Sequence, residues 1–496
     1  MTFKYWRLVV LAPIFVLALA FLVFTPTNVG LTPGGRYVLT VFIIAVSLWA
    51  TMPGRHLPTV SFVVVFLVIL SLAVDLNTRA QSLSTGMSGY ADANLWLLIL
   101  GFVFAAAFER SGLARRIALT LMNLARGSTL GILFMVGLIN ILLAPTTPST
   151  IAKGGLLLPI ILGLVVASGA KKGESNFARG ISIYAGAADN MISAGILTAT
   201  ISNPLAISIL ASAAKIQIGW TEWLVYTFPM ALISTLLAFP LIYLLFKPEM
   251  ATTAGGHEYI KKELKALGRT TSAEWKTLGA FFLALGLWAL DPTILGDAVY
   301  RSLPPLLQAI VGLHAFVKGL IPAAFLLLPR VGVVNWREAE QTIPWGTYVL
   351  FGAALGLSAG LVLTKGLDWA MRIAVTATGI GALPFLGIFV IMVLAMYFAH
   401  TLFFTYTAMA AVTLPIVISL ATTLGLPVLS LYIPAMTLVP FSLIFPFNTV
   451  PLLMFSGAGL FETKHSVKFG VLFGLVVLAL WVVIGIPYWK ALGVIP

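Results

Sequence analysis

The sequence predicts an all-α polytopic membrane protein, with about 11 transmembrane helices and two re-entrant hairpins. Of its 496 residues, 60% are hydrophobic and only 9% are charged, so the chain has too little polar surface to fold as soluble globular domains. Apolar stretches recur along its whole length, each near the ~20 residues that a spanning helix needs. Examples are residues 6–26, 36–52, 58–75, 275–291 and 466–486.

The first of these stretches is expected to remain in the protein as a helix. Residues 6–26 are too long for the apolar core of a signal peptide, and they contain no small-residue cleavage site. They also lead straight into a second apolar stretch. We therefore do not interpret them as a cleavable leader.

The net charge of +13 comes from basic residues that lie between the apolar stretches. This distribution is typical of cytoplasmic loops and not of a nucleic-acid-binding face, so no nucleic-acid partner is expected. The longest polar segment, residues 247–276, is rich in Lys and is predicted to be a cytoplasmic loop. Lys4 and Arg7 place the N-terminus on the same side. We expect a cell (inner) membrane location, with Pro496 outside because an odd number of spans separates the ends.

The sequence offers no support for catalysis or for a bound cofactor. There is no cysteine, and no spacing of His, Asp and Glu is typical of a metal centre. A Gly-rich phosphate loop between a strand and a helix is also absent from the sequence. We expect no metal, no cofactor and no enzymatic activity.

Segments far apart in the chain resemble each other, as in transporters that are built from two inverted copies of one unit. Chance similarity between helices rich in Leu, Ala and Gly is the alternative explanation. The matches run in the same order and at nearly constant separation, and they pair Gly112 with Gly366, Pro159 with Pro415 and Pro204 with Pro451.

Each half is expected to contain one re-entrant hairpin and one helix that polar residues break. Because broken backbone at membrane depth must line a cavity, these interruptions predict a binding site near the midplane. The predicted segments are the first helices at 1–90; a first repeat at 91–246, with a hairpin near 134–166 and a broken helix near 182–212; the loop at 247–276; the first helices of the second repeat at 277–340; and a last segment at 341–496, with a hairpin near 386–420, a broken helix near 430–460 and a C-terminal helix.

The tip of the first hairpin is a candidate carboxylate site. Ser149 or Thr150 is expected to cap the following helix, whose N-terminus offers free N–H donors and about half a positive charge. Lys153 adds a full charge one turn further, and an intramembrane cation usually has a partner or a function. We predict that Lys153 binds substrate; the alternative is that it extends to the membrane interface.

The second tip carries Met409 in place of that lysine, but His400 precedes it. His400 is a candidate ligand, and a structural hydrogen bond to a backbone carbonyl is the alternative. At least one hydroxyl of this tip is expected to face the ligand. The other candidate binding residues are the hydroxyls of the second tip and the polar residues of both breaks: Thr405, Tyr406, Thr407, Ser202, Asn203, Pro204, Asn448, Thr449 and Pro451.

Three acidic residues lie near apolar stretches, where a proton-coupled carrier would need a carboxylate. They are Glu109, Asp189 and Asp368. Glu109 and Asp368 are also explained by neighbouring arginines at helix ends, and Asp189 by a position near a helix start.

These motifs resemble those of the divalent anion:sodium symporter family (DASS/INDY), within the branch of citrate/succinate and 2-oxoglutarate/malate translocators. The likeness covers nearly the whole chain after the third span. The motifs that carry it are residues 108–118, the tip 148–150 with Gly154, Gly155 and Pro159, residues 197–199 with 203–205, residues 220–223, His400 with 405–408, and 449–451 before Ser456 and Gly457.

The resemblance implies a homodimer in which a scaffold domain, here 1–90 and 277–340, supports a transport domain that moves like an elevator. In the family that this chain resembles, sodium-coupled members carry a Ser-Asn-Thr triplet at both hairpin tips. This triplet coordinates sodium and touches the substrate carboxylates. Here the first tip reads Ser149-Thr150-Ile151, or Pro148-Ser149-Thr150 with a shift of one residue, and the second reads Thr405-Tyr406-Thr407; none of them contains the Asn. The resemblance therefore implies transport without sodium, with Lys153 and His400 in place of the missing cations.

The sequence thus predicts a sodium-independent antiporter for small dicarboxylate anions, such as 2-oxoglutarate, malate or succinate, embedded in the lipid bilayer. A dicarboxylate would neutralise Lys153 and two helix N-termini, so the carrier should return only when it is loaded. The alternatives are a sodium- or proton-coupled di/tricarboxylate symporter and, with less support from the sequence, an anion channel or a membrane-embedded enzyme.

Overall fold

The computed structural model describes residues 30–496 with the exception of 53, 404 and 442, together with isolated positions between 13 and 24. The first predicted span, 6–26, lies largely outside the described residues. The described part contains ten helices long and apolar enough to span a membrane, or eleven when the bent pair α15 (Pro305–Gly312) and α16 (Ala315–Leu327) counts as one. It contains no named β-strand. The predicted all-α polytopic fold class is confirmed.

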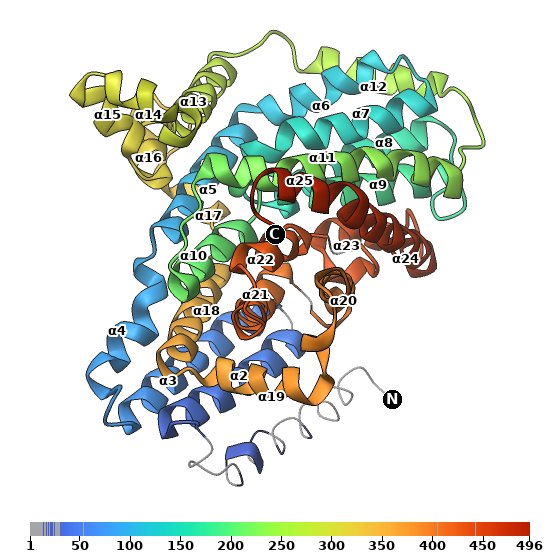
Figure 1. Cartoon of the computed structure of the whole chain (residues 1–496). Helices are drawn as coiled ribbons and strands as arrows, with labels where there is room; N and C mark the ends of the chain where they lie inside the picture. The colour runs from blue at the N-terminus through green and yellow to red at the C-terminus, as the bar shows by residue number, and fades with distance from the viewer. Residues whose placement is uncertain are drawn as a thin grey trace.

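Two groups of helices form one side of the molecule (Figure 1). In the first group, α2 and α3 pack against each other and against α18; in the second, α13 and α16 pack against α5. The short helices α4 and α17 pack against α18 and α5, respectively. Their bounds are α2 (Pro33–Thr51), α3 (Leu57–Val74), α4 (Ser82–Met87), α5 (Ala93–Ser111), α13 (Ser272–Ala289), α14 (Pro292–Ser302), α17 (Trp336–Thr342), α18 (Trp345–Thr364) and α19 (Gly366–Thr378).

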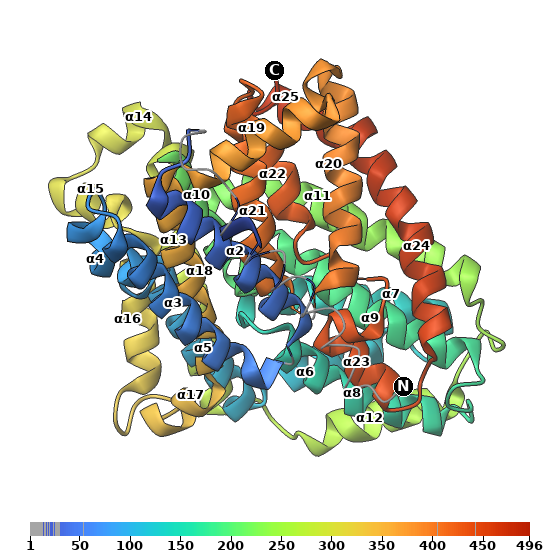
Figure 2. The same cartoon turned by 90° about the horizontal axis from the view of Figure 1, so that it is seen from below.

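The other helices surround the two predicted hairpins (Figures 1 and 2). Here α9 packs against α7, α8 and α11, and α22 packs against α20 and α21. Their bounds are α6 (Leu113–Leu124), α7 (Thr129–Leu143), α8 (Thr150–Ala167), α9 (Asn176–Ala194), α10 (Ser202–Ala214), α11 (Trp220–Leu245), α20 (Phe385–Ala399), α21 (Tyr406–Thr423), α22 (Val428–Leu438), α23 (Val450–Gly457), α24 (Thr463–Leu480) and α25 (Ile486–Ala491).

Both hairpins turn through a short 3₁₀ segment, and the second helix of each begins at a hydroxyl cap. The Ser149 side chain accepts from the Ala152 N–H at the start of α8. The Thr405 side chain accepts from the Ala408 N–H at the start of α21. Each cap satisfies one of the N–H groups that a helix N-terminus leaves free. The two helix starts are therefore locally equivalent, although their residues differ.

The breaks lie between α9 and α10 and between α22 and α23. Proline occupies the first turn after each break, as Pro204 in α10 and Pro451 in α23, where its missing N–H costs no helical hydrogen bond. Across the breaks the two halves exchange partners: α8 packs against α23, and α10 packs against α21. A Cβ on Gly154 of α8 would lie 3.1 Å from the Pro451 Cβ, so the backbones approach closely there. Neither half assembles this region alone.

The polar segment 247–276, predicted as a loop, is mostly helical, with α12 (Ala254–Ala266) and the first turn of α13. Arg115 contacts Glu263 of α12 at 2.6 Å. Arg116 contacts the buried Glu274 of α13 at 2.6 Å and donates to the Gly268 carbonyl at 3.0 Å. Through these contacts α6 is joined to α12 and to the start of α13. The segment 247–276 therefore has a fixed position against α6.

We predict that α12 faces the cytoplasm and the C-terminus faces outside, because Figure 2 shows α12 and α25 at opposite ends of the molecule and α12 carries the Lys cluster. Thr253 is buried and unsuited to labelling, whereas Lys262 and Pro496 are exposed. In this cysteine-free chain, Lys262→Cys should react with an impermeant maleimide only after the cells are opened, and Pro496→Cys in intact cells. The reverse pattern would invert the topology.

Candidate binding site

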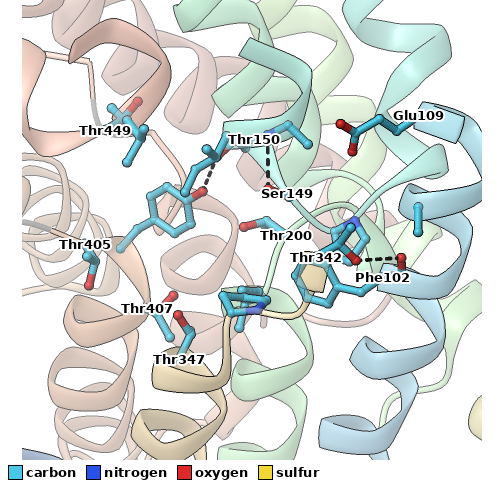
Figure 3. Close-up of a pocket in the computed structure, with 18 of the residues that line it drawn as sticks. Phe102, Glu109, Ser149, Thr150, Thr200, Thr342, Thr347, Thr405, Thr407 and Thr449 are labelled. Atoms are coloured by element: carbon cyan, nitrogen blue, oxygen red, sulfur yellow. Dashed lines mark hydrogen bonds between the residues drawn. The ribbon is translucent and has the colours of Figure 1, made fainter. Parts of the chain in front are cut away.

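A cavity of about 630 Å³ lies where the two hairpin tips and the two helix breaks meet, between them and the helices α5 and α17. Figure 3 shows hydroxyl groups from several of these elements around the same space. Most of the polar residues that line the cavity are hydroxyl-bearing: Ser149, Thr150, Thr200, Thr342, Thr347, Thr405, Tyr406, Thr407 and Thr449.

Four helices begin at this cavity. The residues before their first turns are Ser149 of α8, Ile201 of α10, Thr405 of α21 and Thr449 of α23, and all four line the cavity. Each helix N-terminus carries roughly half a positive charge on its free N–H groups, so together they supply about +2. The tips and breaks can therefore hold an anion without a charged side chain of their own, and the charged side chains of the lining, Glu109, Arg110 and Glu338, come from α5 and α17.

Lys153 does not line this cavity. Its ammonium lies 2.9 Å from Asp189 Oδ1, donates to Ser193 Oγ at 2.7 Å and to the Ala199 carbonyl at 3.5 Å, and both charged side chains are at most 2% exposed. Asp189 lies well inside α9 and not at a helix start. The pair is neutral as a unit, so the full positive charge that the sequence prediction assigns to the site is compensated. Lys153 instead joins α8 to α9 and to the first break.

His400 is also buried away from the cavity. Its Nε2 hydrogen-bonds to the Leu438 carbonyl at 3.1 Å, and its own carbonyl accepts from Asn448 Nδ2 at 2.6 Å. Asn448 also donates to the Phe403 carbonyl at 3.0 Å. This arrangement joins the second hairpin to the second break, as the Lys153–Asp189 pair does in the first half.

Seven of the thirteen candidate residues line the cavity and six do not. The amide of Asn203 donates to the carbonyls of Ser193 and Ile196, at 2.7 and 2.9 Å, and so closes the first break. The residues that do not line the cavity are Lys153, Ser202, Asn203, Pro204, His400 and Pro451; those that do are Ser149, Thr150, Thr405, Tyr406, Thr407, Asn448 and Thr449.

Residues of α5 and α17 line one side of the cavity, which the sequence analysis did not predict. Arg110 and Glu338 form an exposed ion pair at 3.4 Å beside Glu109, and Thr342 donates to the Phe102 carbonyl at 3.2 Å. Only packing brings these helices to the tips, so no local sequence signal marks them. Thr200, which also lines the cavity, lies within the predicted broken helix near 182–212 and could have been included.

No group of three or more His, Cys, Asp or Glu side chains that could hold a metal ion occurs among the residues that the structure describes. The buried Thr449 Oγ1 has no hydrogen-bond partner. Near the second tip, Tyr406 Oη and Thr150 Oγ1 share a hydrogen bond of 2.5 Å (Figure 3). The cavity therefore offers hydroxyls and backbone N–H groups as its main ligands.

Nearly the whole chain is similar to known membrane transporters. The family model described as "Sodium:sulfate symporter transmembrane region" matches residues 3–495. The citrate/succinate antiporter of Escherichia coli (strain K12) is 27% identical over 97% of this chain and 97% of its own length. The L-tartrate/succinate antiporter of Shigella dysenteriae is 27% identical over the same shares. The crystal structure of the Alcanivorax borkumensis YdaH transporter is similar in fold, with a TM-score of 0.57 and 16% identity, and covers 88% of this chain and 99% of its own.

The Lys153–Asp189 pair predicts strong coupling between two substitutions. Lys153→Met and Asp189→Asn should each destabilise the protein by about 3–5 kcal/mol, because each leaves an unpaired buried charge. The double substitution should recover most of that loss in thermal unfolding measurements on purified protein. Arg110→Met, which breaks the exposed Arg110–Glu338 pair, is the matched control and should change stability little. Additive losses in the double variant would contradict a paired role.

Proposed function

Because the chain belongs to the family described as the sodium:sulfate symporter transmembrane region, and so is a membrane transporter and not an enzyme, we propose that it exchanges small dicarboxylate anions across the membrane. The observation that carries this proposal is the convergence of four helix N-termini on one hydroxyl-lined cavity. The names of its bacterial relatives, citrate/succinate and L-tartrate/succinate antiporter, support the same substrate class.

The charge of the site matches a dicarboxylate. Four helix N-termini supply about +2, and a dianion brings −2, so the tips and breaks with their ligand are close to neutral, while Glu109 and the Arg110–Glu338 pair lie on the opposite side, on α5 and α17. The Lys153–Asp189 pair adds no net charge beside it. The hydroxyls of Ser149, Thr150 and other lining residues can donate to the carboxylate oxygens in addition.

The same balance supports exchange over one-way transport. An empty site exposes four uncompensated N-termini, and moving them through the low-dielectric part of the path is unfavourable, whereas the loaded site moves as a neutral unit. The carrier then returns only with a second anion bound. The positive charge of the site thus comes from the helix N-termini and not, as the sequence predicted, from a free Lys153.

We propose sodium independence on the basis of the groups around the first break. The ammonium of Lys153 already occupies oxygen atoms of Asp189, Ser193 and Ala199 that a bound cation would otherwise coordinate. Both tips also lack the Asn of the sodium-coupled triplet. In this proposal a covalently attached ammonium serves where sodium-coupled relatives bind a free ion, and His400 stabilises the second tip without contacting substrate.

An elevator mechanism and a homodimer are part of the proposal. The first hairpin tip packs directly on α5, where a Cβ on Gly101 would lie 2.9 Å from the Pro148 Cγ. In this proposal α5 (Ala93–Ser111), which the sequence prediction leaves outside the scaffold 1–90 and 277–340, belongs to the scaffold, and a transport domain that carries the four N-termini slides along it. The apolar faces exposed on the α13–α16 side, which include Phe282 and Ile321, suit a partner subunit or lipid.

The alternative is a sodium- or proton-coupled symporter, which the family description favours. Coupling by sodium requires a free cation site, and coupling by protons requires a carboxylate that exchanges protons during transport, for which the buried Asp189 is the candidate. Its ion pair with Lys153 argues against that role.

Exchange should depend on internal substrate and not on sodium. Proteoliposomes preloaded with malate should take up labelled succinate or 2-oxoglutarate equally in sodium and choline buffers, and empty liposomes should take up little. Citrate added outside tests whether tricarboxylates compete. A severalfold stimulation by sodium, or equal uptake into empty liposomes, would contradict sodium-independent antiport.

Gly101→Leu should reduce exchange by at least about tenfold. The new side chain would clash with Pro148 of the first hairpin tip where the tip packs on α5. Overpacking of this kind costs about 1–3 kcal/mol. Binding of succinate to the purified protein should change much less. Gly279→Leu on α13 is the control, since a Cβ there meets no atom within 4 Å. Unchanged exchange in Gly101→Leu would show that the tip does not move along α5 at this point.

A further inference from the structure

Thr150 and Tyr406 occupy equivalent positions in the two halves and contact each other. Each is the first helical residue after a hydroxyl cap, in α8 and α21, respectively. They lie 256 residues apart in the chain, which is also the separation of Pro159 from Pro415, and their hydroxyls share a hydrogen bond of 2.5 Å. Equivalent residues of two symmetric halves meet only near the axis that relates them. The hydrogen bond therefore marks the midline of the cavity.

The four helix N-termini are distributed on the two sides of this midline. On one side α8 packs against α23, and on the other side α21 packs against α10. A dicarboxylate with one carboxylate on each side then places its central carbons beside the Thr150–Tyr406 pair. Thr200 also lies beside the Tyr406 hydroxyl as a polar neighbour, and Figure 3 shows it near Thr150.

We propose that the Thr150–Tyr406 pair recognises a hydroxyl group on the central carbons of the substrate, so that the protein prefers 2-hydroxydicarboxylates over unsubstituted dicarboxylates. This inference rests on the proposed function. Threonine and tyrosine hydroxyls each donate and accept, so a substrate hydroxyl can insert between them and both donate and accept. Tyr406 is the one tyrosine among the described residues that line this cavity, so no other phenol hydroxyl can take its role.

The expected preference is moderate. With an unsubstituted dicarboxylate the two hydroxyls keep their bond to each other, so no buried polar group is left without a partner and binding is still possible. An inserted substrate hydroxyl breaks the Thr150–Tyr406 hydrogen bond and forms two new ones, so it adds one net hydrogen bond, which corresponds to about a tenfold gain in affinity. A third carboxylate at this position would meet no unpaired cation, because Lys153 is compensated by Asp189.

The test compares malate with succinate, which differ by one hydroxyl and have the same carbon chain. Unlabelled malate, succinate or tartrate competes with labelled substrate for exchange in proteoliposomes, and the ratio of apparent affinities for malate and succinate is measured. In the wild type this ratio should favour malate by about tenfold. It should fall to near one in Tyr406→Phe, which keeps the ring and loses the hydroxyl, and in Thr150→Val.

Two further variants separate recognition from a structural effect. Thr150→Ser keeps the hydroxyl and should keep the preference for malate. Tyr243→Phe, on α11 and outside the cavity lining, should leave the ratio unchanged. Because the readout is a ratio within one protein, a loss of expression does not change it, and a variant without exchange is compared by calorimetric binding of the same two acids.

The outcomes distinguish this inference from the proposed function. A wild-type protein that exchanges both acids with equal affinity, or a Tyr406→Phe protein that keeps the wild-type ratio, would overturn the inference and leave dicarboxylate exchange intact. A wild-type protein that exchanges no dicarboxylate would overturn the proposed function itself.

Discussion

The site depends on one constraint, which is that backbone groups at membrane depth need hydrogen-bond partners. Every helix start leaves several N–H groups without intrahelical partners, and this chain places four helix starts around one cavity. Ser149 and Thr405 satisfy one N–H group each. The remaining donors make the cavity suitable for an anion, so the interrupted backbone is both the structural difficulty and the source of the binding potential.

Each half stabilises its interruption with a different polar contact. In the first half a buried ion pair, Lys153 with Asp189, connects the hairpin to the broken helix. In the second half Asn448 donates to the carbonyls of His400 and Phe403. The equivalence of the halves is therefore geometric and not chemical, which explains why Lys153 has only Met409 as its counterpart in the sequence. In both halves this polar contact carries no net charge. The helix N-termini are therefore the main source of positive potential in the site.

The fold class, the hairpin positions and about half of the candidate site could be predicted from the sequence, because apolar length, caps and Pro positions are local signals. Ser149 and Thr405 cap the helices as their residue types predict. The partner of Lys153 could not be predicted, since Asp189 lies on another helix and only packing brings the two together. The contribution of α17, with Thr342, was missed for the same reason, and Glu109 of α5 was considered only as a carboxylate for proton coupling and not as part of the cavity lining.

The source of the positive potential also determines how the site can be regulated. A lysine in contact with substrate could lose its charge through titration or move with the ligand, whereas helix N-termini carry partial charges that neither titrate nor move relative to the backbone. Selectivity then has to come from shape and from hydroxyl groups, because every dicarboxylate satisfies the same charge balance. The hydroxyls of Thr150 and Tyr406 stand where such selection is possible, at the contact between the two halves. In the proposed mechanism, the positive potential of the helix N-termini selects dicarboxylates as a class, and hydrogen bonds to hydroxyl groups select among them.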